Sequence, residues 1–234
     1  MSQNYFSFKQ FTVYHDLCAM KVGTDGVLLG AWANCENCGN ILDIGTGSGL
    51  IALMLAQRSH AEIDAIDIDE SAYKQAFGNF ENSGFEKRLK AYHADFFQFK
   101  PAYSYDLIVS NPPYFVDSLQ SPDEQRTGAR HTNNLFFSRM IEKSYQILSS
   151  KGKLSLILPY ESLSTISNIA EKNQFYLSRK TIVRSMENHP PKRVLLEFSK
   201  ETNSSEEQDI FIEKSRHVYS DAYIRLTRDF YLKM

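Results

Sequence analysis

Near the start of the chain stands Asp43-Ile44-Gly45-Thr46-Gly47-Ser48-Gly49, a glycine-rich stretch between the apolar run 40–44 and a helical pattern over 50–58. Glycines at such a junction allow a tight turn and let a ligand approach the backbone, and the helix start presents unpaired N–H groups. The spacing is G-x-G-x-G, whereas a dinucleotide site carries G-x-G-x-x-G and would place its third glycine at Leu50. The stretch therefore predicts a strand, a ligand-binding turn and a helix, without the dinucleotide fingerprint.

The alternation of short apolar runs and helical patterns continues outward from this turn. It is typical of βαβ units, in which a mostly parallel sheet is covered by helices on both faces. Two later β-rich runs, 175–183 and 193–198, are joined by a link too short for a crossover helix, so they predict an antiparallel hairpin at one edge of the sheet. The other expected strands are 62–67, 89–93, 105–110, 153–159 and 210–212, and the other expected helices are 70–82, 134–149, 162–172 and 220–232.

Length and composition fit one α/β domain over residues 1–234, with an N-terminal extension (1–38), a core (39–200) and a C-terminal strand and helix (201–234). Hydrophobic residues make up 42% and charged residues 23%, which excludes a disordered, collagen-like or coiled-coil chain. No apolar run approaches the roughly 20 residues of a membrane-spanning helix, and the first residues lack the pattern of a secretory signal. We therefore expect a cytoplasmic protein.

The three cysteines do not predict a disulfide framework, because their number is odd. Cys35 and Cys38 have a C-x2-C spacing, but a structural zinc site needs four ligands and no second Cys/His pair lies nearby. We interpret them as two thiols beside a turn and expect no metal.

Acidic residues follow three successive expected strands. Asp43 stands before the first glycine, where it can accept a hydrogen bond from an ammonium group, and Asp67 ends the next strand, where a carboxylate can accept both ribose hydroxyls of a nucleoside. Asp69, close by, is expected to cap the next helix. Asp95 can accept from an adenine amino group, and Phe96 can pack on the adenine ring. Each carboxylate alone is more often a turn or cap residue, but at the ends of neighbouring parallel strands they converge on one crevice.

The expected strand 105–110 ends abruptly in Asn111-Pro112-Pro113-Tyr114. By itself this tetrapeptide fits a rigid turn, because prolines fix φ and stop strands. Beside the ligand crevice, the prolines can hold the Pro112 carbonyl and the Asn111 side-chain oxygen toward one point, where both accept hydrogen bonds from one planar NH2 group. Tyr114 can stack on a flat substrate. The expected catalytic residues are therefore Asn111, Pro112 and Tyr114.

The strand-end pattern resembles the class I S-adenosylmethionine-dependent methyltransferases over roughly residues 20 to 200. The resemblance implies a Rossmann-like fold with a mostly parallel seven-stranded sheet, and S-adenosylmethionine as the cofactor. It places the methionine part of the cofactor on the glycine turn, the ribose at Asp67 and the adenine at Asp95. The implied cofactor-binding residues are Asp43, Gly45, Gly47, Gly49, Asp67, Asp95, Phe96 and Asn111.

The Asn111 tetrapeptide looks like that of amino-group methyltransferases, which act on N6 of adenine in DNA or RNA, on N2 of guanine in rRNA, or on a glutamine amide of a protein. The tetrapeptide alone does not separate these substrates. The run from Met20 to Trp32 is very similar to one in the bacterial tRNA1(Val) N6-adenosine methyltransferases, which modify adenosine-37 beside the anticodon. The similarity continues in the runs 43–50, 110–115, 193–198 and 219–223, and it implies methyl transfer to N6 of that adenosine.

The same resemblance places the segment Lys21 to Asp25 beside the cofactor as a lid, so that Lys21 and Thr24 become further cofactor-binding candidates. The residues themselves fit a turn leading into an apolar helix equally well. A protein glutamine methyltransferase and a noncatalytic cofactor-binding protein remain the alternative functions.

Basic residues that could contact an RNA lie in two segments. The stretch from Arg179 to Arg193 holds five basic residues against one acidic residue, which fits a solvated strand surface as well as a phosphate-binding surface. An anticodon loop has accessible bases, which favours recognition by stacking and phosphate contacts; the net charge of −2 indicates modest affinity for naked RNA. We expect a monomer that binds tRNA through Arg126, Arg130 and His131 after the tetrapeptide, through His189, Lys192 and Arg193 of the hairpin, and through Tyr114.

Overall fold

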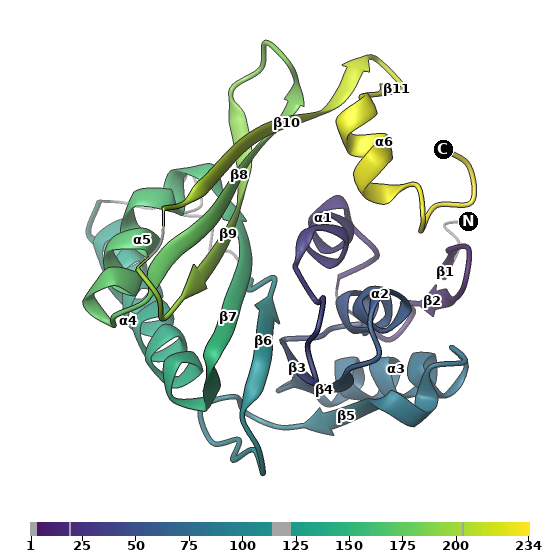
Figure 1. Cartoon of the computed structure of the whole chain (residues 1–234), viewed down its shortest axis with the longest axis horizontal. Helices are drawn as coiled ribbons and strands as arrows, with labels where there is room; N and C mark the ends of the chain where they lie inside the picture. Colours follow the sequence, from purple (N-terminus) through teal and green to yellow (C-terminus); the bar gives the residue numbers. More distant parts are fainter. Residues whose placement is uncertain (1–3, 19, 114–122, 203) are drawn as a thin grey trace.

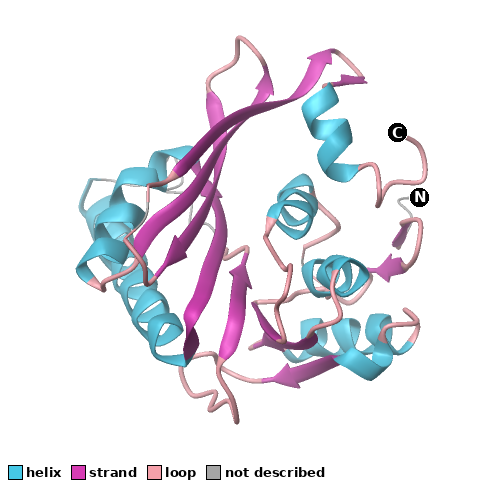
Figure 2. Ribbon diagram, in the orientation of Figure 1, coloured by secondary structure: helices cyan, strands magenta, loops and turns pink. Residues whose placement is uncertain are grey.

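A computed structural model of the chain describes residues 4–18, 20–113, 123–202 and 204–234, and for residues 123–131 and 133 it describes the backbone alone. Within these residues, one large twisted sheet carries helices on both of its faces (Figure 1, Figure 2). The expected α/β architecture is confirmed. No helix in the described ranges is long and apolar enough to cross a membrane.

Five parallel strands form the half of the sheet that carries the glycine turn. The glycine-turn strand, β3, lies between β4 and β6, so the order of the strands reverses at this point. In open α/β sheets, a ligand binds outside the carboxyl ends of the strands at such a reversal. The order is β5 (Leu89–His93), β4 (Glu62–Asp67), β3 (Asn40–Ile44), β6 (Tyr105–Ser110) and β7 (Leu148–Pro159).

The hairpin is confirmed, but it does not form the edge of the sheet. Its strands, β8 (Tyr176–Met186) and β9 (Pro191–Ser199), are antiparallel, and β9 pairs with β7. β10 (Glu206–Ser215) then adds to β8 in parallel, and β11 (Val218–Tyr219) adds to β10. The sheet therefore has nine strands in the described residues, where seven were expected.

The polar start of β10 explains why the longer strand was not expected. Residues 206–209 are charged or polar and looked like a loop, and only 210–212 looked like a strand. In the structure, the charged side chains meet opposite charges on β8: Lys180 Nζ lies 2.8 Å from Glu207 Oε1. Backbone pairing with β8 and such cross-strand pairs stabilise the polar start of the strand, whereas Ile210 and Ile212 further along it pack against the core.

The helices divide between the two faces of the sheet because neighbouring strand residues point to opposite sides. In β3, Ile41 belongs to the core under α1 (Thr24–Trp32) and α2 (Leu50–Arg58), whereas Leu42 belongs to the core on the other face. The first face also carries α3 (Glu70–Glu81) and α6 (Asp221–Thr227), and the second carries α4 (Asp123–Ile147) and α5 (Leu163–Lys172). The structure starts α4 before the expected residue 134 and ends α6 before the expected residue 232.

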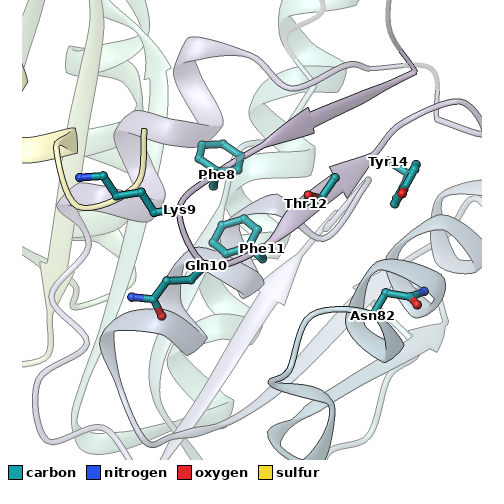
Figure 3. A pocket seen from close by; sticks show the side chains of 7 residues that line it. All are labelled: Phe8, Lys9, Gln10, Phe11, Thr12, Tyr14 and Asn82. Atoms are coloured by element: carbon teal, nitrogen blue, oxygen red, sulfur yellow. The ribbon is translucent and has the colours of Figure 1, made fainter. Parts of the chain in front are cut away.

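A small N-terminal sheet, which the sequence did not predict, consists of β1 (Tyr5–Ser7) and β2 (Thr12–Tyr14). The turn between these strands borders an open hollow of about 620 Å³, and Figure 3 shows the side chains that line it. Asn79 of α3 links β2 to the glycine turn, because its Nδ2 donates to the carbonyls of Tyr14 and Ser48, each at 2.8 Å. These two hydrogen bonds hold the end of β2 close to the glycine turn.

Candidate active site

A cavity of about 440 Å³ opens at the carboxyl ends of β3, β4, β5 and β6, where the strand order reverses. Most of its exposed lining is apolar, and the polar groups come from the strand ends. Seven of the predicted site residues line it: Gly45, Gly47, Asp67, Asp95, Phe96, Asn111 and Pro112. The other lining residues are Cys18, Met20, Ile44, Ile66, Ile68, Asp69, Ala72, Ala94, Phe97, Ser110, Pro113 and Phe136.

Two positions of the turn require glycine for different physical reasons. Gly47 has φ +58°, and a Cβ added to it would meet nothing within 4 Å, so the backbone is bare toward the cavity. Gly49 has φ +80°, and a Cβ there would lie 2.5 Å from Cε1 of Phe80. Gly47 thus leaves room for a ligand, whereas Gly49 leaves room for close packing of α3.

Asp67 lies at the end of β4, and its carboxylate supports the glycine turn. Its Oδ2 accepts from the Gly47 N–H at 2.9 Å, and its Oδ1 accepts from the Asp69 N–H at 2.9 Å. Asp69 caps α3, as expected, by accepting from the N–H groups of Ser71 and Ala72. Because a carboxylate oxygen accepts more than one hydrogen bond, Asp67 keeps acceptor capacity toward the cavity that it lines.

Asp43 is fully buried beneath the turn and does not line the cavity. Thr46 Oγ1 donates to its Oδ2 at 2.6 Å, and its Oδ1 has no hydrogen-bond partner among the described residues. Burial raises the pKa of Asp43 to about 7, although the hydrogen bond from Thr46 opposes the shift. The backbone N–H of Ala52 in α2 also lowers the pKa of Asp43, and contact between Asp43 and an ammonium remains a prediction.

Asp95 and Phe96 follow β5 and form the next part of the wall. Asp95 Oδ1 accepts from the Phe97 N–H at 2.8 Å, and Oδ2 accepts from Gln98 Nε2 at 3.0 Å, so the carboxylate is held by its own loop. Phe96 is only 7% exposed, and the part that remains accessible faces the cavity. The aromatic ring and the carboxylate thus present an apolar surface and an acceptor together, which suits a nucleobase.

Asn111, Pro112 and Pro113 lie directly after β6 and line the same cavity as the glycine turn. Ser110 Oγ fastens this corner by donating to the Ile44 carbonyl at 2.9 Å. The sheet register pairs Ile44 with Ser110, so the tetrapeptide starts beside the start of the glycine turn. Tyr114 lies outside the described residues, and its role remains a prediction.

The predicted lid residues stand beside the cavity without lining it. Lys21 is exposed and precedes α1, and Thr24 begins that helix. Cys18 and Met20, which precede the predicted lid in the sequence, do line the cavity. Asp25 accepts from Arg193 Nε at 2.7 Å, which ties the start of α1 to the hairpin near its turn.

Sequence reasoning missed several apolar lining residues. Ile68 is 69% exposed although it follows a buried strand, and an apolar side chain directly after the strand-end Asp67 was an available signal. His93 Nε2 lies 3.0 Å from the Ile68 carbonyl and steadies this corner. Met20 and Phe136 come from distant segments, and no local pattern indicated that they reach the cavity.

The basic residues of the hairpin are largely engaged in ion pairs. Arg179 pairs with Glu197 at 3.0 Å, and Arg184 pairs with Asp209 at 3.0 Å, in addition to the pairs of Lys180 and Arg193. The positive charge that the sequence shows is therefore mostly neutralised by tertiary contacts. His189 and Lys192 are exposed near the turn of the hairpin, whereas the side chains of Arg126, Arg130 and His131 lie outside the described part of the structure.

The donor set of the cavity suits an organic ligand and not a metal ion. Among the described residues, no three His, Cys, Asp or Glu side chains gather as a metal site requires. The lining matches the three parts of S-adenosylmethionine. The bare backbone at Gly47 suits the methionine part, the acceptor at Asp67 suits the ribose, and Asp95 with the ring of Phe96 suits the adenine. Beside the glycine turn, Asn111 supplies an amide next to a proline-stiffened backbone.

Comparisons with known proteins agree with this geometry. The family model described as "Methyltransferase small domain" matches residues 22–178. A "tRNA1(Val) (adenine(37)-N6)-methyltransferase" of Parabacteroides distasonis is 48% identical over 237 residues, with 100% of both chains covered. A protein of the same name from Phocaeicola vulgatus is 49% identical over 234 residues, again with 100% of both covered.

Two solved structures show the same fold at low sequence identity. A predicted O-methyltransferase from Agrobacterium tumefaciens has a TM-score of 0.69 at 20% identity, over 88% of this chain and 96% of that chain. A T. thermophilus 16S rRNA N2 methyltransferase in complex with AdoMet and guanosine has a TM-score of 0.58 at 18% identity, over 84% of this chain and 50% of that chain. The chain therefore belongs to the methyltransferase small domain family and, within it, to the tRNA1(Val) (adenine(37)-N6)-methyltransferases.

Proposed function

We propose that this protein transfers the methyl group of S-adenosylmethionine to N6 of adenosine-37 in the anticodon loop of tRNA1(Val). The observation that carries the proposal is that Asn111 and Pro112 line the same cavity as Gly47 and Asp67. A group that can hold an amine and a surface that suits the methyl donor therefore line one cavity. The names of the full-length relatives supply the identity of the amine.

Seven residues and the three glycines of the turn are proposed to hold the cofactor. Bound S-adenosylmethionine supplies an electrophilic methyl group on a positively charged sulfur. The bare backbone at Gly47 admits its methionine part, Asp67 accepts from the ribose hydroxyls, and Asp95 accepts from the adenine amino group. The full proposed set is Lys21, Thr24, Asp43, Gly45, Gly47, Gly49, Asp67, Asp95, Phe96 and Asn111.

Asn111 and Pro112 are proposed to orient the target amine. The lone pair of an exocyclic amine is delocalised into its ring, which makes the nitrogen a poor nucleophile. The Asn111 side-chain oxygen and the Pro112 carbonyl accept one hydrogen bond each from the NH2 group, so the two hydrogens are drawn aside and the lone pair points into the cavity. Orientation and proximity then supply much of the rate, without a strong general base. Tyr114 is proposed to stack on the adenine.

The tRNA is proposed to lie across the strand-end side of the sheet. Adenosine-37 must leave its stack to reach the cavity, as in other enzymes that act on a base. The proposed contacts are Arg126, Arg130 and His131 on the α4 side, and His189, Lys192 and Arg193 at the hairpin. We propose that the enzyme acts as a monomer in the cytoplasm, where its tRNA substrate is found.

The test is methylation of defined tRNA by the purified protein. Unmodified tRNA1(Val) transcript and S-adenosylmethionine are incubated with the enzyme, and the digested nucleosides are measured by mass spectrometry. We expect N6-methyladenosine in this transcript and none in a matched transcript with guanosine at position 37. Equal methylation of both transcripts, or methylation only of a protein glutamine amide, would refute the proposed substrate.

A further inference from the structure

One wall of the cavity is an aromatic pair that carries an arginine on its outer side. Phe97 and Phe136 both line the cavity, and their rings meet edge to face with centroids 5.7 Å apart. Arg139 stands one helical turn after Phe136 in α4, and its guanidinium carbon lies 4.3 Å from the centre of the Phe97 ring. An exposed arginine is thus held against the ring that borders the cavity.

Two other stacked arginines in the described residues have structural roles that account for their positions. Arg88 stacks on Phe85 and donates to three backbone carbonyls. Arg179 stacks on Trp32 and donates to the Trp32 carbonyl and to Glu197. Their guanidinium groups are therefore tied to the protein as well as to a ring.

Arg139 differs because its guanidinium has a ring contact but makes no hydrogen bond or ion pair with the described residues. Stacking on Phe97 restricts the side chain but leaves the in-plane N–H groups free to donate. Lys143, one turn later, is not equivalent, because its Nζ donates to the Phe99 carbonyl at 2.7 Å. Arg139 is therefore a restrained cation with its donors still available.

The charges around the cavity show what kind of group Arg139 can meet. The lining of the cavity carries the carboxylates of Asp67, Asp69 and Asp95. These acceptors suit hydroxyl and amino groups, and they repel an anion. Arg139 stacks on Phe97, a residue of the cavity lining, so it places a cation next to this wall of the cavity.

We infer that Arg139 binds a backbone phosphate of the RNA strand that delivers the target adenosine to the cavity. A planar guanidinium offers two parallel N–H groups to a phosphate, and a side chain already held by a ring loses less conformational entropy when it binds. The inference rests on the proposed function, because it takes the substrate to be an RNA. It assigns Arg139 to substrate positioning and leaves methyl-donor binding to the strand ends.

The experiment compares Arg139→Gln with Arg225→Gln, which removes the same charge from an exposed arginine on α6, across the sheet from α4 (Figure 1). Dissociation constants for tRNA1(Val) transcript are measured over a range of salt concentrations, and S-adenosylmethionine affinity is measured by calorimetry. For Arg139→Gln we expect about tenfold weaker tRNA binding and a salt slope smaller by about 0.8, with unchanged cofactor affinity. Arg225→Gln should match the wild type.

A second variant, Arg139→Lys, separates the charge from the shape of the guanidinium. Lysine still neutralises the phosphate and so still releases its counterion, and the salt slope of this variant should equal that of the wild type. Its tRNA binding should weaken about threefold, because the ammonium cannot make the two parallel hydrogen bonds of the guanidinium. Wild-type tRNA affinity and salt slope in Arg139→Gln would overturn the inference even when the wild-type enzyme methylates tRNA. Failure of the wild-type enzyme to methylate tRNA would instead refute the proposed function.

Discussion

Replacing Gly47 or Gly49 by alanine should separate cofactor binding from folding within one turn. Both residues have positive φ, so alanine at either position costs about 1–2 kcal/mol of backbone strain. At Gly49, the new methyl group would also lie 2.5 Å from the Phe80 ring, and overpacking of this kind costs a further 1–3 kcal/mol or so. We therefore expect Gly49→Ala to lower the free energy of unfolding by about 2–5 kcal/mol, and Gly47→Ala to lower it by about 1–2 kcal/mol.

Cofactor affinity should be affected in the opposite order, more by Gly47→Ala than by Gly49→Ala. The methyl group of Gly47→Ala has no protein atom within 4 Å and enters the space where the methionine part of the cofactor is proposed to lie, so affinity should fall at least tenfold. Urea unfolding gives the two stabilities, and calorimetry below the unfolding transition gives the affinities. Wild-type cofactor affinity in Gly47→Ala would refute the reasoning, and so would equal destabilisation by the two variants.

Three further variants test other parts of the molecule. Asn111→Ala should keep cofactor affinity and lower the turnover number by about 10² to 10³, since one polarising acceptor is lost, and normal single-turnover methylation would contradict its role. Asp43 has a pKa raised by burial to about 7. The folded state therefore holds a proton that the unfolded state releases near its ordinary pKa, and wild-type stability falls as pH rises from about 4 to about 7. Asp43→Asn should not lose stability with rising pH in this way. In thermal melts, its stability relative to that of the wild type should therefore improve by about 2 kcal/mol between pH 5 and pH 8. A stability difference between variant and wild type that does not depend on pH would contradict the burial argument. Glu197→Gln leaves Lys153 and Arg179 without their buried carboxylate and should cost about 2–3 kcal/mol in urea unfolding, and a stability within experimental error of wild type would show that the pairs contribute nothing.

The parts of the site that the sequence predicted are those whose chemistry is local. A few neighbouring residues are enough to predict the turn that contains Gly47, the strand-end Asp67 and the corner that begins at Asn111. The reason is that positive φ, helix capping and proline geometry are properties of short segments. Their convergence also followed, since parallel strands bring their carboxyl ends to one edge. The cavity indeed collects all three.

The parts that were missed depend on contacts between segments far apart in the chain. β10 looked like a loop in its first half, because its polar residues find their partners only on β8. The basic hairpin looked like a free cationic surface, but Arg193 meets Asp25 across a separation of 168 residues. Cys18 and Met20 line the cavity, a placement that no local pattern shows.

By itself, the sequence determined the order of strands and helices from residue 40 to residue 199, the glycine turn and the proline corner at Asn111, because these follow from backbone stereochemistry and from the period of apolar residues. Only the tertiary structure decided which charges remain exposed and which side chains complete the cavity wall. Long-range packing and ion pairing depend on where separate elements meet, as Arg139 on Phe97 and Arg193 on Asp25 both show. Arg139 stacks on an aromatic ring, whereas Arg193 pairs with the carboxylate of Asp25 at the start of α1, a difference that residue type and local spacing do not reveal.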